Sequence, residues 1–316
     1  MSESMKRVQL GRTNVEVSVA GLGCGGYSRL GMATGHGEAH ASDIVRHALD
    51  LGINFIDTAR AYGTESAVGA AIKGRRDSVV LSSKALPRGR NGLLSAAALT
   101  QSLEKSLARL GTDCIDVFHL HGVELADYPY CRDELVPELL RQRDLGKIRF
   151  LGITERFSAD TAHAMLGAAL PENHFDVIMV GFNLLNPAAR HRVFPLTLEY
   201  HVGTLIMFAV RRALSQPDAL AKALDGLIAS GQIDSSAFDA SDPLAFVADH
   251  PEVRSLVEAA YRYCRYEPGA HVVLTGTGSI DHLTENVASI LAPALPDTLL
   301  DRLNSLFGAV DSLSGN

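Results

Sequence analysis

The sequence predicts an α/β protein in which eight strand–helix units close into one barrel. Three observations lead to this fold class. Eight strand-like segments alternate with amphipathic helical patterns, as in a (β/α)8 or TIM barrel. A short hairpin pattern precedes the first of them. The glycine-rich segment 21–26 lacks the phosphate fingerprint and the immediate helix that an open, doubly wound sheet normally has after its first strand.

The strands are recognised as short apolar or β-branched runs. A hairpin is expected within residues 6–20, where two alternating runs flank a turn at residues 11–14. The eight barrel strands are then expected near residues 21, 54, 79, 116, 149, 178, 205 and 272. A helical pattern follows each strand except the first and the seventh, where a loop intervenes.

The helices are recognised by apolar residues at helical spacing. They are expected over about 39–51, 64–73, 95–110, 132–145, 159–170, 187–199, 253–263, 281–291 and 299–306. Pro137 is compatible with its helix only if it falls in the first turn. The long excursion after strand seven, about 211–250, contains its own helix at 220–228 and a polar piece at 234–242.

Composition limits the class of protein. The 316 residues carry 29 Lys and Arg against 36 Asp and Glu, a net charge of −7, which argues against nucleic acid or an anionic membrane as a partner. No apolar run reaches the roughly 18–20 residues of a membrane span. The cysteines (Cys24, Cys114, Cys131 and Cys264) are far apart, so we expect reduced thiols in a cytoplasmic protein. A single domain over residues 1–316 is expected, and no feature indicates an oligomeric state.

Polar residues end three neighbouring strands of the predicted barrel. Asp57 ends strand two, Lys84 strand three and His121 strand four, and Tyr62 lies in the loop beyond strand two. An isolated Asp and Tyr would more often be a structural hydrogen-bond pair. In a barrel, however, the C-terminal ends of all strands face one mouth. The four side chains should therefore converge there, which indicates proton chemistry.

The physical chemistry of these groups favours one arrangement. A phenol with a pKa near ~10 donates poorly at neutral pH, and a nearby ammonium such as Lys84 would lower that pKa. Asp57 can keep Lys84 charged and fixed. A carbonyl held between Tyr62 and His121 would be polarised toward hydride attack. The hydride must come from a cofactor, since no side chain carries one.

At these residues the chain resembles the aldo-keto reductase family. The matching segments occur in the family's order over nearly the whole chain: 10–13, 21–23, 52–59, 62–63, 83–84, 115–121, 276 and 282–286. The resemblance implies that the hairpin closes the N-terminal end, the bottom, of the barrel. It also implies NADPH or NADH bound across the C-terminal mouth, and catalytic roles for Asp57, Tyr62, Lys84 and His121, with Tyr62 as the general acid or base.

The resemblance also implies cofactor contacts at the strand ends. They fall on Gly23, Asp57, Thr154, Asn183, Phe208, Gly276, Thr277, Ser279, His282, Glu285 and Asn286. Three other positions depart from the family's pattern. Glu155 stands where Asn usually holds the nicotinamide amide, Met179 where Gln is common, and Gly278 near the Arg or Lys that binds a 2′-phosphate. The choice between NADPH and NADH therefore stays open.

Three other interpretations remain. His119 and His121 form an HxH pattern that also suits zinc, although strands six to eight offer no obvious further ligand; otherwise His119 is a barrel-interior residue with one hydrogen bond. Lys84 alone could be a Schiff-base nucleophile, but a paired Asp57 would raise its pKa. The departures at the amide-binding positions leave open a nicotinamide-binding redox sensor or regulatory protein on the same barrel, with little turnover.

We therefore expect an NAD(P)H-dependent oxidoreductase that reduces an aldehyde or ketone to an alcohol, or the reverse, without a metal. The substrate would be a small carbonyl compound or alcohol, selected by the loops 27–40, 122–131 and about 209–250. Arg211 and Arg212 in the last loop could grip a carboxylate or phosphate, or be solvated or helix-capping residues. The sequence does not indicate the physiological substrate or the preferred direction of reaction.

Overall fold

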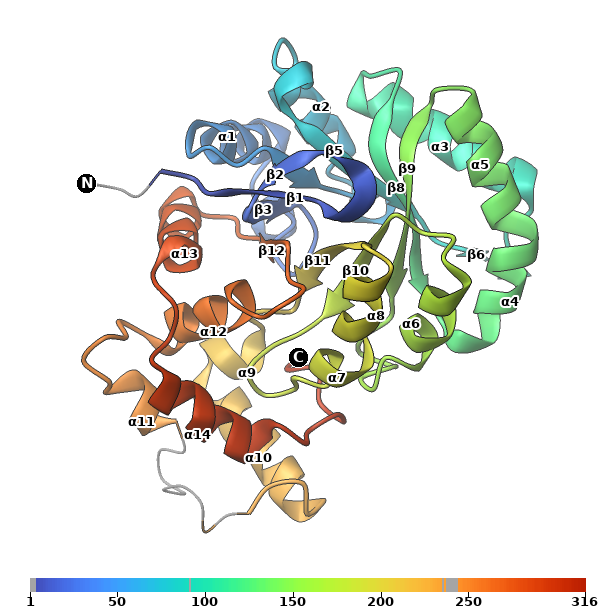
Figure 1. Ribbon diagram of the computed structural model, residues 1–316. Coiled ribbons are helices and arrows are strands. Elements are labelled where there is room, and N and C mark those ends of the chain that lie inside the picture. The colour runs from blue at the N-terminus through green and yellow to red at the C-terminus, as the bar shows by residue number, and fades with distance from the viewer. Residues whose placement is uncertain (1–3, 91, 235, 237–243) are drawn as a thin grey trace.

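The computed structural model describes residues 4–90, 92–234, 236 and 244–316, so most of the expected polar piece 234–242 lies outside the described residues. Eight parallel strands close into a barrel, which confirms the (β/α)8 TIM barrel (Figure 1). In order around the barrel they are β3 (Ala20–Gly23), β4 (Phe55–Asp57), β5 (Val80–Ala85), β8 (Ile115–Val123), β9 (Ile148–Glu155), β10 (Val177–Gly181), β11 (Gly203–Met207) and β12 (Val272–Thr275).

The N-terminal hairpin closes the bottom of the barrel. Its strands β1 (Arg7–Gln9) and β2 (Glu16–Ser18) pair antiparallel. Leu10 and Val17 are fully buried in one cluster with strand residues such as Phe55 and Leu205. Gly203, the first residue of β11, makes room for this plug, because a Cβ atom there would lie 2.7 Å from Leu10 Cγ.

Helices surround the barrel and bury one face each. The principal ones are α1 (Glu38–Asp50), α2 (Glu65–Ile72), α3 (Ala96–Leu110), α5 (Val136–Asp144), α6 (Ala164–Ala169), α7 (Ala189–Arg192), α8 (Phe194–Glu199), α12 (Leu256–Arg265), α13 (Ile280–Leu291) and α14 (Asp297–Phe307). In α3 the Ser95 side chain caps the first turn by accepting a hydrogen bond from Ala98 N at 3.3 Å. Gly111, at φ 65°, ends the helix.

Two expected helices are shorter or broken for local reasons. The segment 159–170 becomes helical only at Ala164, because His163 has a left-handed φ of 61° and the Asp160 carboxylate accepts from Ala164 N and Met165 N. The segment 187–199 divides into α7 and α8 at Val193, and Pro195 lies in the first turn of α8, where its missing N–H costs nothing.

The helix expected at 132–145 begins differently. A short 3-residue helix, α4 (Tyr128–Tyr130), and a π-helical segment (Cys131–Leu135) lead into α5. Pro137 falls in the first turn of α5, the only part of a helix in which a proline is readily tolerated. Before α3, two short strands, β6 (Arg88–Gly89) and β7 (Gly92–Leu93), form a hairpin beyond the end of β5.

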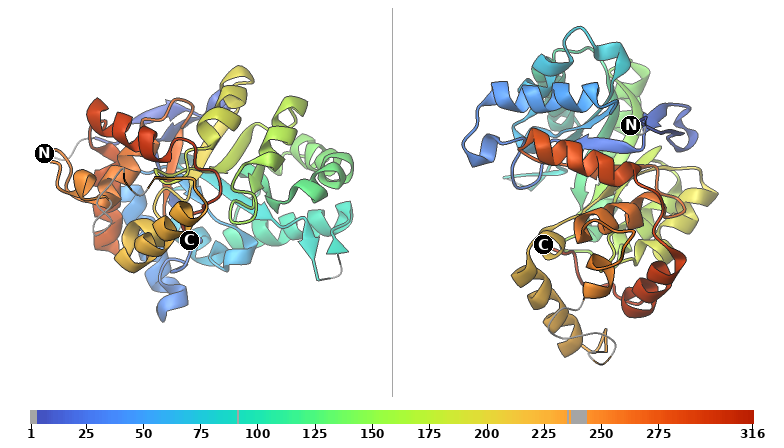
Figure 2. Two further views of the ribbon diagram at one scale, coloured as in Figure 1. Left: turned by 90° about the horizontal axis from the view of Figure 1, so that it is seen from below. Right: turned by 90° about the vertical axis from the view of Figure 1, so that its left-hand side faces the viewer.

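The excursion after β11 packs against α12 and the C-terminal tail. It contains α9 (Arg212–Ser215), α10 (Pro217–Ala229) and α11 (Ala245–Ala248). Figures 1 and 2 show α10 with α14 at the opposite end of the molecule from α1 and α2. After α14 the C-terminal tail returns to the barrel mouth, where Gly315 O accepts from Ala213 N at 3.1 Å and Leu313 O from Asn186 Nδ2 at 2.8 Å.

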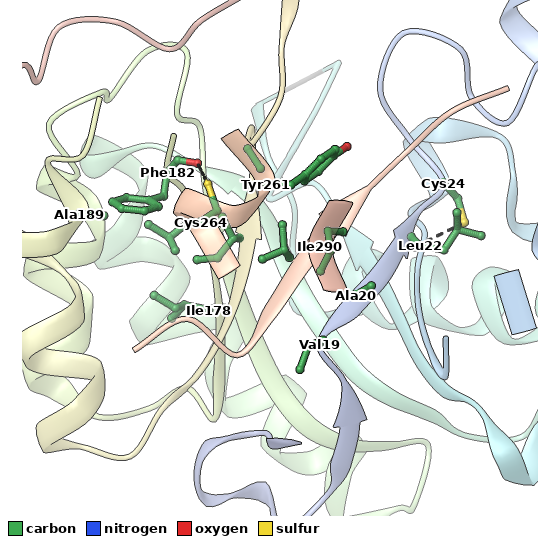
Figure 3. Packing of buried hydrophobic residues seen from close by; sticks show 14 of the residues in the cluster. Val19, Ala20, Leu22, Cys24, Ile178, Phe182, Ala189, Tyr261, Cys264 and Ile290 are labelled. Carbon is green, nitrogen blue, oxygen red and sulfur yellow. Dashed lines mark hydrogen bonds between the residues drawn. The ribbon is translucent and has the colours of Figure 1, made fainter. Parts of the chain in front are cut away.

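The largest apolar cluster lies between the strands and the helices. Part of it is drawn in Figure 3, where Cys264 Sγ lies 3.3 Å from Phe182 O. All four cysteines are free thiols, and Cys114 is the only one of them that is not fully buried. Within the described ranges no helix is long and apolar enough to cross a bilayer.

Candidate active site

An ion pair is buried where β4 and β5 reach the barrel mouth. Lys84 Nζ lies 2.6 Å from each carboxylate oxygen of Asp57 and 2.9 Å from Thr58 O, and the lysine side chain is completely buried. Ser82 Oγ donates to Asp57 Oδ1 at 2.7 Å. Burial disfavours the ammonium, but Asp57 and Tyr62 outweigh burial and raise the pKa of Lys84. Asp57 therefore holds the Lys84 ammonium in place.

Tyr62 lies between this ion pair and His121. It ends the 3₁₀ turn Arg60–Tyr62, its hydroxyl is 3.3 Å from His121 Nε2, and Lys84 Nζ is 5.0 Å from its ring centroid. The ring packs directly on Gly25, where a Cβ atom would lie 2.7 Å from two ring carbons. This contact explains one glycine of the segment that follows β3: the backbone there passes close to the tyrosine ring.

The direction of the Tyr62 pKa differs from the expectation. Burial raises the pKa of the phenol above its ordinary value, Lys84 acts in the opposite direction, and burial prevails. The sequence predicted a net lowering because it shows the lysine but not the loss of water around the phenol. Tyr62 is therefore held in its protonated form, and Lys84 reduces the free-energy cost of the phenolate instead of making it the resting state.

His121 is an uncharged imidazole beside Tyr62. Burial, and next the ammonium of Lys84, lower the pKa of His121 to about 3. Its Nε2 faces the Tyr62 hydroxyl, and among the described residues its Nδ1 has no hydrogen-bond partner. A neutral imidazole can either donate or accept at Nε2, depending on its tautomer. Tyr62 and His121 thus present two hydrogen-bonding atoms to the same point.

His119 lies on the same strand but is enclosed in the barrel. It is completely buried, and neither ring nitrogen has a hydrogen bond of good geometry within the described part of the chain. The strand beside it carries Gly152, where a Cβ atom would lie 2.2 Å from His119 Nδ1. No group of three or more His, Cys, Asp or Glu side chains is placed to hold a metal ion in the described ranges.

A cavity of about 350 Å³ opens beside Tyr62 and His121. Its apolar lining includes Phe157, Met179, Met207 and Phe208. Phe208 follows β11 with a left-handed φ of 66°, which is unusual for a bulky residue and is tolerated mainly at functional sites. The volume is within the range of sites for small molecules.

Charged side chains surround the outer part of this cavity as ion pairs. Arg88, in the hairpin beyond β5, binds both carboxylate oxygens of Asp127, and Arg156 binds Glu124. Glu124 and Asp127 lie in the loop 122–131 that the sequence indicated, whereas Arg88 and Arg156 lie outside the segments that it indicated. Their pairing joins three loops that are distant in sequence, and no local pattern in the sequence carries that information.

The predicted nicotinamide contacts divide into two groups. Thr154 and Phe208 line the cavity, and Thr154 Oγ1 also accepts from Gly122 N at 2.7 Å. Asn183 lies elsewhere: its Oδ1 accepts from two backbone N–H groups, and its Nδ2 is 3.4 Å from Ser314 O. Asn183 thus anchors the C-terminal tail, and its contact with a cofactor stays a prediction.

The remaining predicted cofactor residues lie at the neighbouring β12–α13 turn. Gly276 lies against Gly23, because a Cβ atom on Gly276 would be 2.6 Å from Gly23 O. Ser279 caps α13 by accepting from His282 N, and Thr277 Oγ1 accepts from Ser279 N at 3.1 Å. Glu285 is exposed one turn further along α13.

The same turn explains why Gly278 stands where the family's pattern has an Arg or Lys. A Cβ atom on Gly278 would lie 2.9 Å from Gly31 Cα, so the loop after β3 occupies the space of a side chain there. Asn286 Nδ2 donates a hydrogen bond to Thr275 Oγ1 at 2.9 Å. This bond fixes the orientation of the Asn286 amide.

The two arginines after β11 have different surroundings. The Arg211 guanidinium lies 4.3 Å from the Phe208 ring centroid, and its Nε donates to Asn316 Oδ1 at 2.6 Å. Arg212 begins α9. Arg211 therefore belongs to the mouth of the barrel, and the C-terminal residue contacts it there.

Comparison with known proteins gives a consistent result. The Aldo/keto reductase family model matches residues 21–307. The uncharacterized oxidoreductase YqkF of Bacillus subtilis (strain 168) is 27% identical over 310 residues, which cover 95% of this chain and 96% of YqkF. Aldo-keto reductase YhdN of the same organism is 31% identical over 220 residues, 66% of this chain and 63% of YhdN. The holo form of aldo-keto reductase AKR11C1 from Bacillus halodurans superimposes with a TM-score of 0.75 at 27% identity, covering 97% of both chains.

Proposed function

The chain belongs to the aldo/keto reductase family, and from this premise we propose that it is an NAD(P)H-dependent oxidoreductase that interconverts a small aldehyde or ketone and the corresponding alcohol. The observation that carries the proposal is the convergence of Tyr62, Lys84, Asp57 and His121 beside a cavity with an aromatic wall. Fixed proton-transfer groups next to an apolar cavity suit reduction of a carbonyl group.

The residues at the mouth fit a nicotinamide dinucleotide. Phe208 offers an aromatic face in the cavity, and Thr154 offers a hydroxyl near it. Gly23 and Gly276 have no side chains, so the backbone at these two positions is accessible to a ligand. A dinucleotide, when bound, supplies the hydride. We propose Phe208 and Thr154 for the nicotinamide end and the β12–α13 turn, with Ser279 and Asn286, for the adenosine end.

The protein's own groups would then manage the proton. Tyr62 donates its proton to the carbonyl oxygen as negative charge develops there, and His121 Nε2 orients that oxygen by a second hydrogen bond. Lys84 stabilises the phenolate that remains, and Asp57 holds Lys84 charged and in place. In the oxidative direction the same groups act in reverse, with Tyr62 as the base.

The pKa directions describe the protonation of the resting protein. Burial keeps Tyr62 protonated, so the proton needed for reduction is present before the substrate binds. The low pKa of His121, about 3, keeps the imidazole uncharged, so it competes little with Tyr62 as the proton donor.

Binding and turnover test the proposal together. Isothermal titration calorimetry with NADH and NADPH should show one site for at least one of them, and a panel of small aldehydes should then consume the reduced dinucleotide. Absence of heat from both dinucleotides up to millimolar concentration would refute the proposal. Binding without turnover of any aldehyde or ketone would favour a sensor or regulatory protein instead.

A further inference from the structure

Two ion pairs line the cavity of the candidate active site, and the proton-transfer steps involve neither of them. Arg88 Nε and Nη2 donate to Asp127 Oδ2 and Oδ1, each at 2.5 Å. Arg156 Nη1 donates to Glu124 Oε1. The side chains of Arg88, Arg156 and Glu124 are 54%, 60% and 45% exposed, whereas that of Asp127 is only 4% exposed. Three of the four charged groups are therefore open to a molecule that enters the cavity.

Chemistry and contacts fix the charges of the two pairs. A guanidinium stays protonated in proteins, and the hydrogen bond to Asp127 raises the pKa of Arg88 further. Both oxygens of Asp127 accept from Arg88, as an ionised carboxylate does in a two-point contact with arginine. Glu124 accepts from the Arg156 guanidinium in the same way. Each pair thus consists of one cation and one anion and is neutral as a whole.

Within the described ranges, no unpaired cation lines the cavity. Burial keeps Tyr62 protonated and His121 uncharged. Glu155, which also belongs to the lining, is completely buried. Lys84 and Arg211 lie nearby, but neither is part of the lining. A substrate that carries a negative charge would therefore meet guanidinium groups only together with the carboxylates that neutralise them.

The Arg88–Asp127 pair lies where the far end of a substrate is expected. Arg88 follows β5, and Phe208 follows β11. In the order of strands around the barrel, β5 and β11 stand opposite each other. With the nicotinamide ring at Phe208, a carbonyl compound held at Tyr62 extends toward the β5 side of the mouth, where Leu86 adds an apolar surface.

We propose that the Arg88–Asp127 and Arg156–Glu124 pairs make the cavity select uncharged carbonyl compounds over those that carry a carboxylate or phosphate group. The inference rests on the proposed function. The attraction of an anionic substrate to each guanidinium is offset by repulsion from the adjacent carboxylate. Such a substrate also loses water on entering a cavity with an apolar lining, and no free counter-ion replaces that water. An uncharged aldehyde or ketone avoids both costs.

Initial rates with 4-formylbenzoate and its methyl ester test the proposal, because the two aldehydes differ mainly in charge. With the reduced dinucleotide saturating, we expect kcat/KM of the wild-type protein to favour the ester by at least about tenfold. Asp127→Asn keeps an acceptor for Arg88 and removes the negative charge. The preference for the ester should then fall about tenfold, mainly through a lower KM for the carboxylate.

Glu124→Gln makes the same change at the second, more exposed pair. It should shift the preference in the same direction, and it provides the test if Asp127→Asn does not fold. Asp133→Asn is the matched control. Asp133 accepts from Arg132 through both oxygens, as Asp127 does from Arg88, but neither Asp133 nor Arg132 lines the cavity. Its substitution should leave the preference unchanged.

Two results would overturn the inference. One is a wild-type protein that reduces the carboxylate as efficiently as the ester. The other is an unchanged preference in folded Asp127→Asn or Glu124→Gln. If the wild-type protein reduced no aldehyde at all, the ester included, the proposed function itself would fail, which is a different result.

Discussion

Lys84 is fully buried, and its ammonium contacts both oxygens of Asp57 and the carbonyl of Thr58. Lys84→Met would leave the Asp57 carboxylate buried without its cation. We expect the free energy of unfolding to fall by about 3–5 kcal/mol, as is typical when one partner of a buried pair is removed. Urea unfolding followed by circular dichroism measures this change.

An exposed ion pair provides the control for that prediction. Arg46 and Asp43 are 2.6 Å apart on α1, with side chains 47% and 60% exposed. Arg46→Met should cost less than about 1 kcal/mol, because water screens such pairs. Equal losses in the two variants would show that the Lys84–Asp57 pair is not a buried ionic contact.

Tyr62 is the residue whose chemistry is most specific. Tyr62→Phe removes the proton donor and keeps the ring on Gly25, so we expect kcat to fall by about 10²–10⁴ while the Kd of the dinucleotide stays nearly unchanged. Tyr266→Phe, whose hydroxyl donates to Ala292 O on the surface, should change neither. A Tyr62 variant with wild-type kcat would assign the proton to another group.

Residue types and strand positions alone indicated that four side chains would lie together, because the strand ends of a barrel share one mouth. These are Asp57, Tyr62, Lys84 and His121. Residue types and strand positions could not give the direction of the Tyr62 pKa, which depends on how completely the phenol is buried. They also missed the partner of Glu155, since His163 reaches it through a left-handed backbone turn rather than a regular element.

At the scale of elements, β10 packs so closely against the loop after β9 that no side chain fits at Gly181. In Gly181→Ala the new methyl group would overlap the Phe157 ring, and we expect a loss of about 1–3 kcal/mol in unfolding free energy. Gly167→Ala is the matched change inside α6, where nothing lies within 4 Å of the added Cβ.

The α6 variant should be neutral or gain up to about 1 kcal/mol, since alanine is the better helix former. The same urea unfolding series measures both variants. If Gly181→Ala were as well tolerated as Gly167→Ala, then Phe157 would not be fixed against β10.

Periodicity predicted the strands better than the helices. The eight strands are short apolar runs bounded by clear turn signals, and each was found near its expected position. The helix breaks at His163 and Val193 depend on an Asp160 side chain that caps the next turn and on a proline that starts α8. The Asp160 cap is compatible with a continuous helix, so spacing alone did not reveal it. The proline is a break signal that the spacing pattern over 187–199 does not take into account.

At the scale of the whole molecule, we propose that residues 1–316 form one domain. The barrel, the helix layer and the C-terminal tail share contacts, and the tail reaches the mouth through Asn186 and Ala213. Thermal unfolding should then give one transition that coincides by near- and far-ultraviolet circular dichroism. Two separated transitions would show that part of the chain, such as the α9–α11 excursion, unfolds independently.

Acid stability is a second property of the whole molecule. Unfolding restores the ordinary pKa of His121, 6.5, whereas in the folded protein it is about 3. Below pH 6.5 His121 binds a proton in the unfolded chain but not in the folded chain. The contribution of His121 to the free energy of unfolding is therefore fully present above pH 6.5 and is lost as the pH falls toward 3. Within that window this group contributes a slope of about 1.4 kcal/mol per pH unit.

The slope can be assigned by substitution. His121→Asn should reduce the pH dependence of the unfolding free energy by that share. An unchanged slope in His121→Asn would mean that the imidazole is already protonated in the folded protein, which would also remove it as a neutral partner of the substrate oxygen.

The most direct test of the account follows the hydride itself. A reduced dinucleotide that carries deuterium at the transferable C4 position is incubated with a small aldehyde that the protein turns over, and the alcohol is analysed by mass spectrometry. The account predicts one deuterium on the carbinol carbon with the wild-type protein and little product with Tyr62→Phe. An alcohol without deuterium, or equal deuterated product from both proteins, would contradict it.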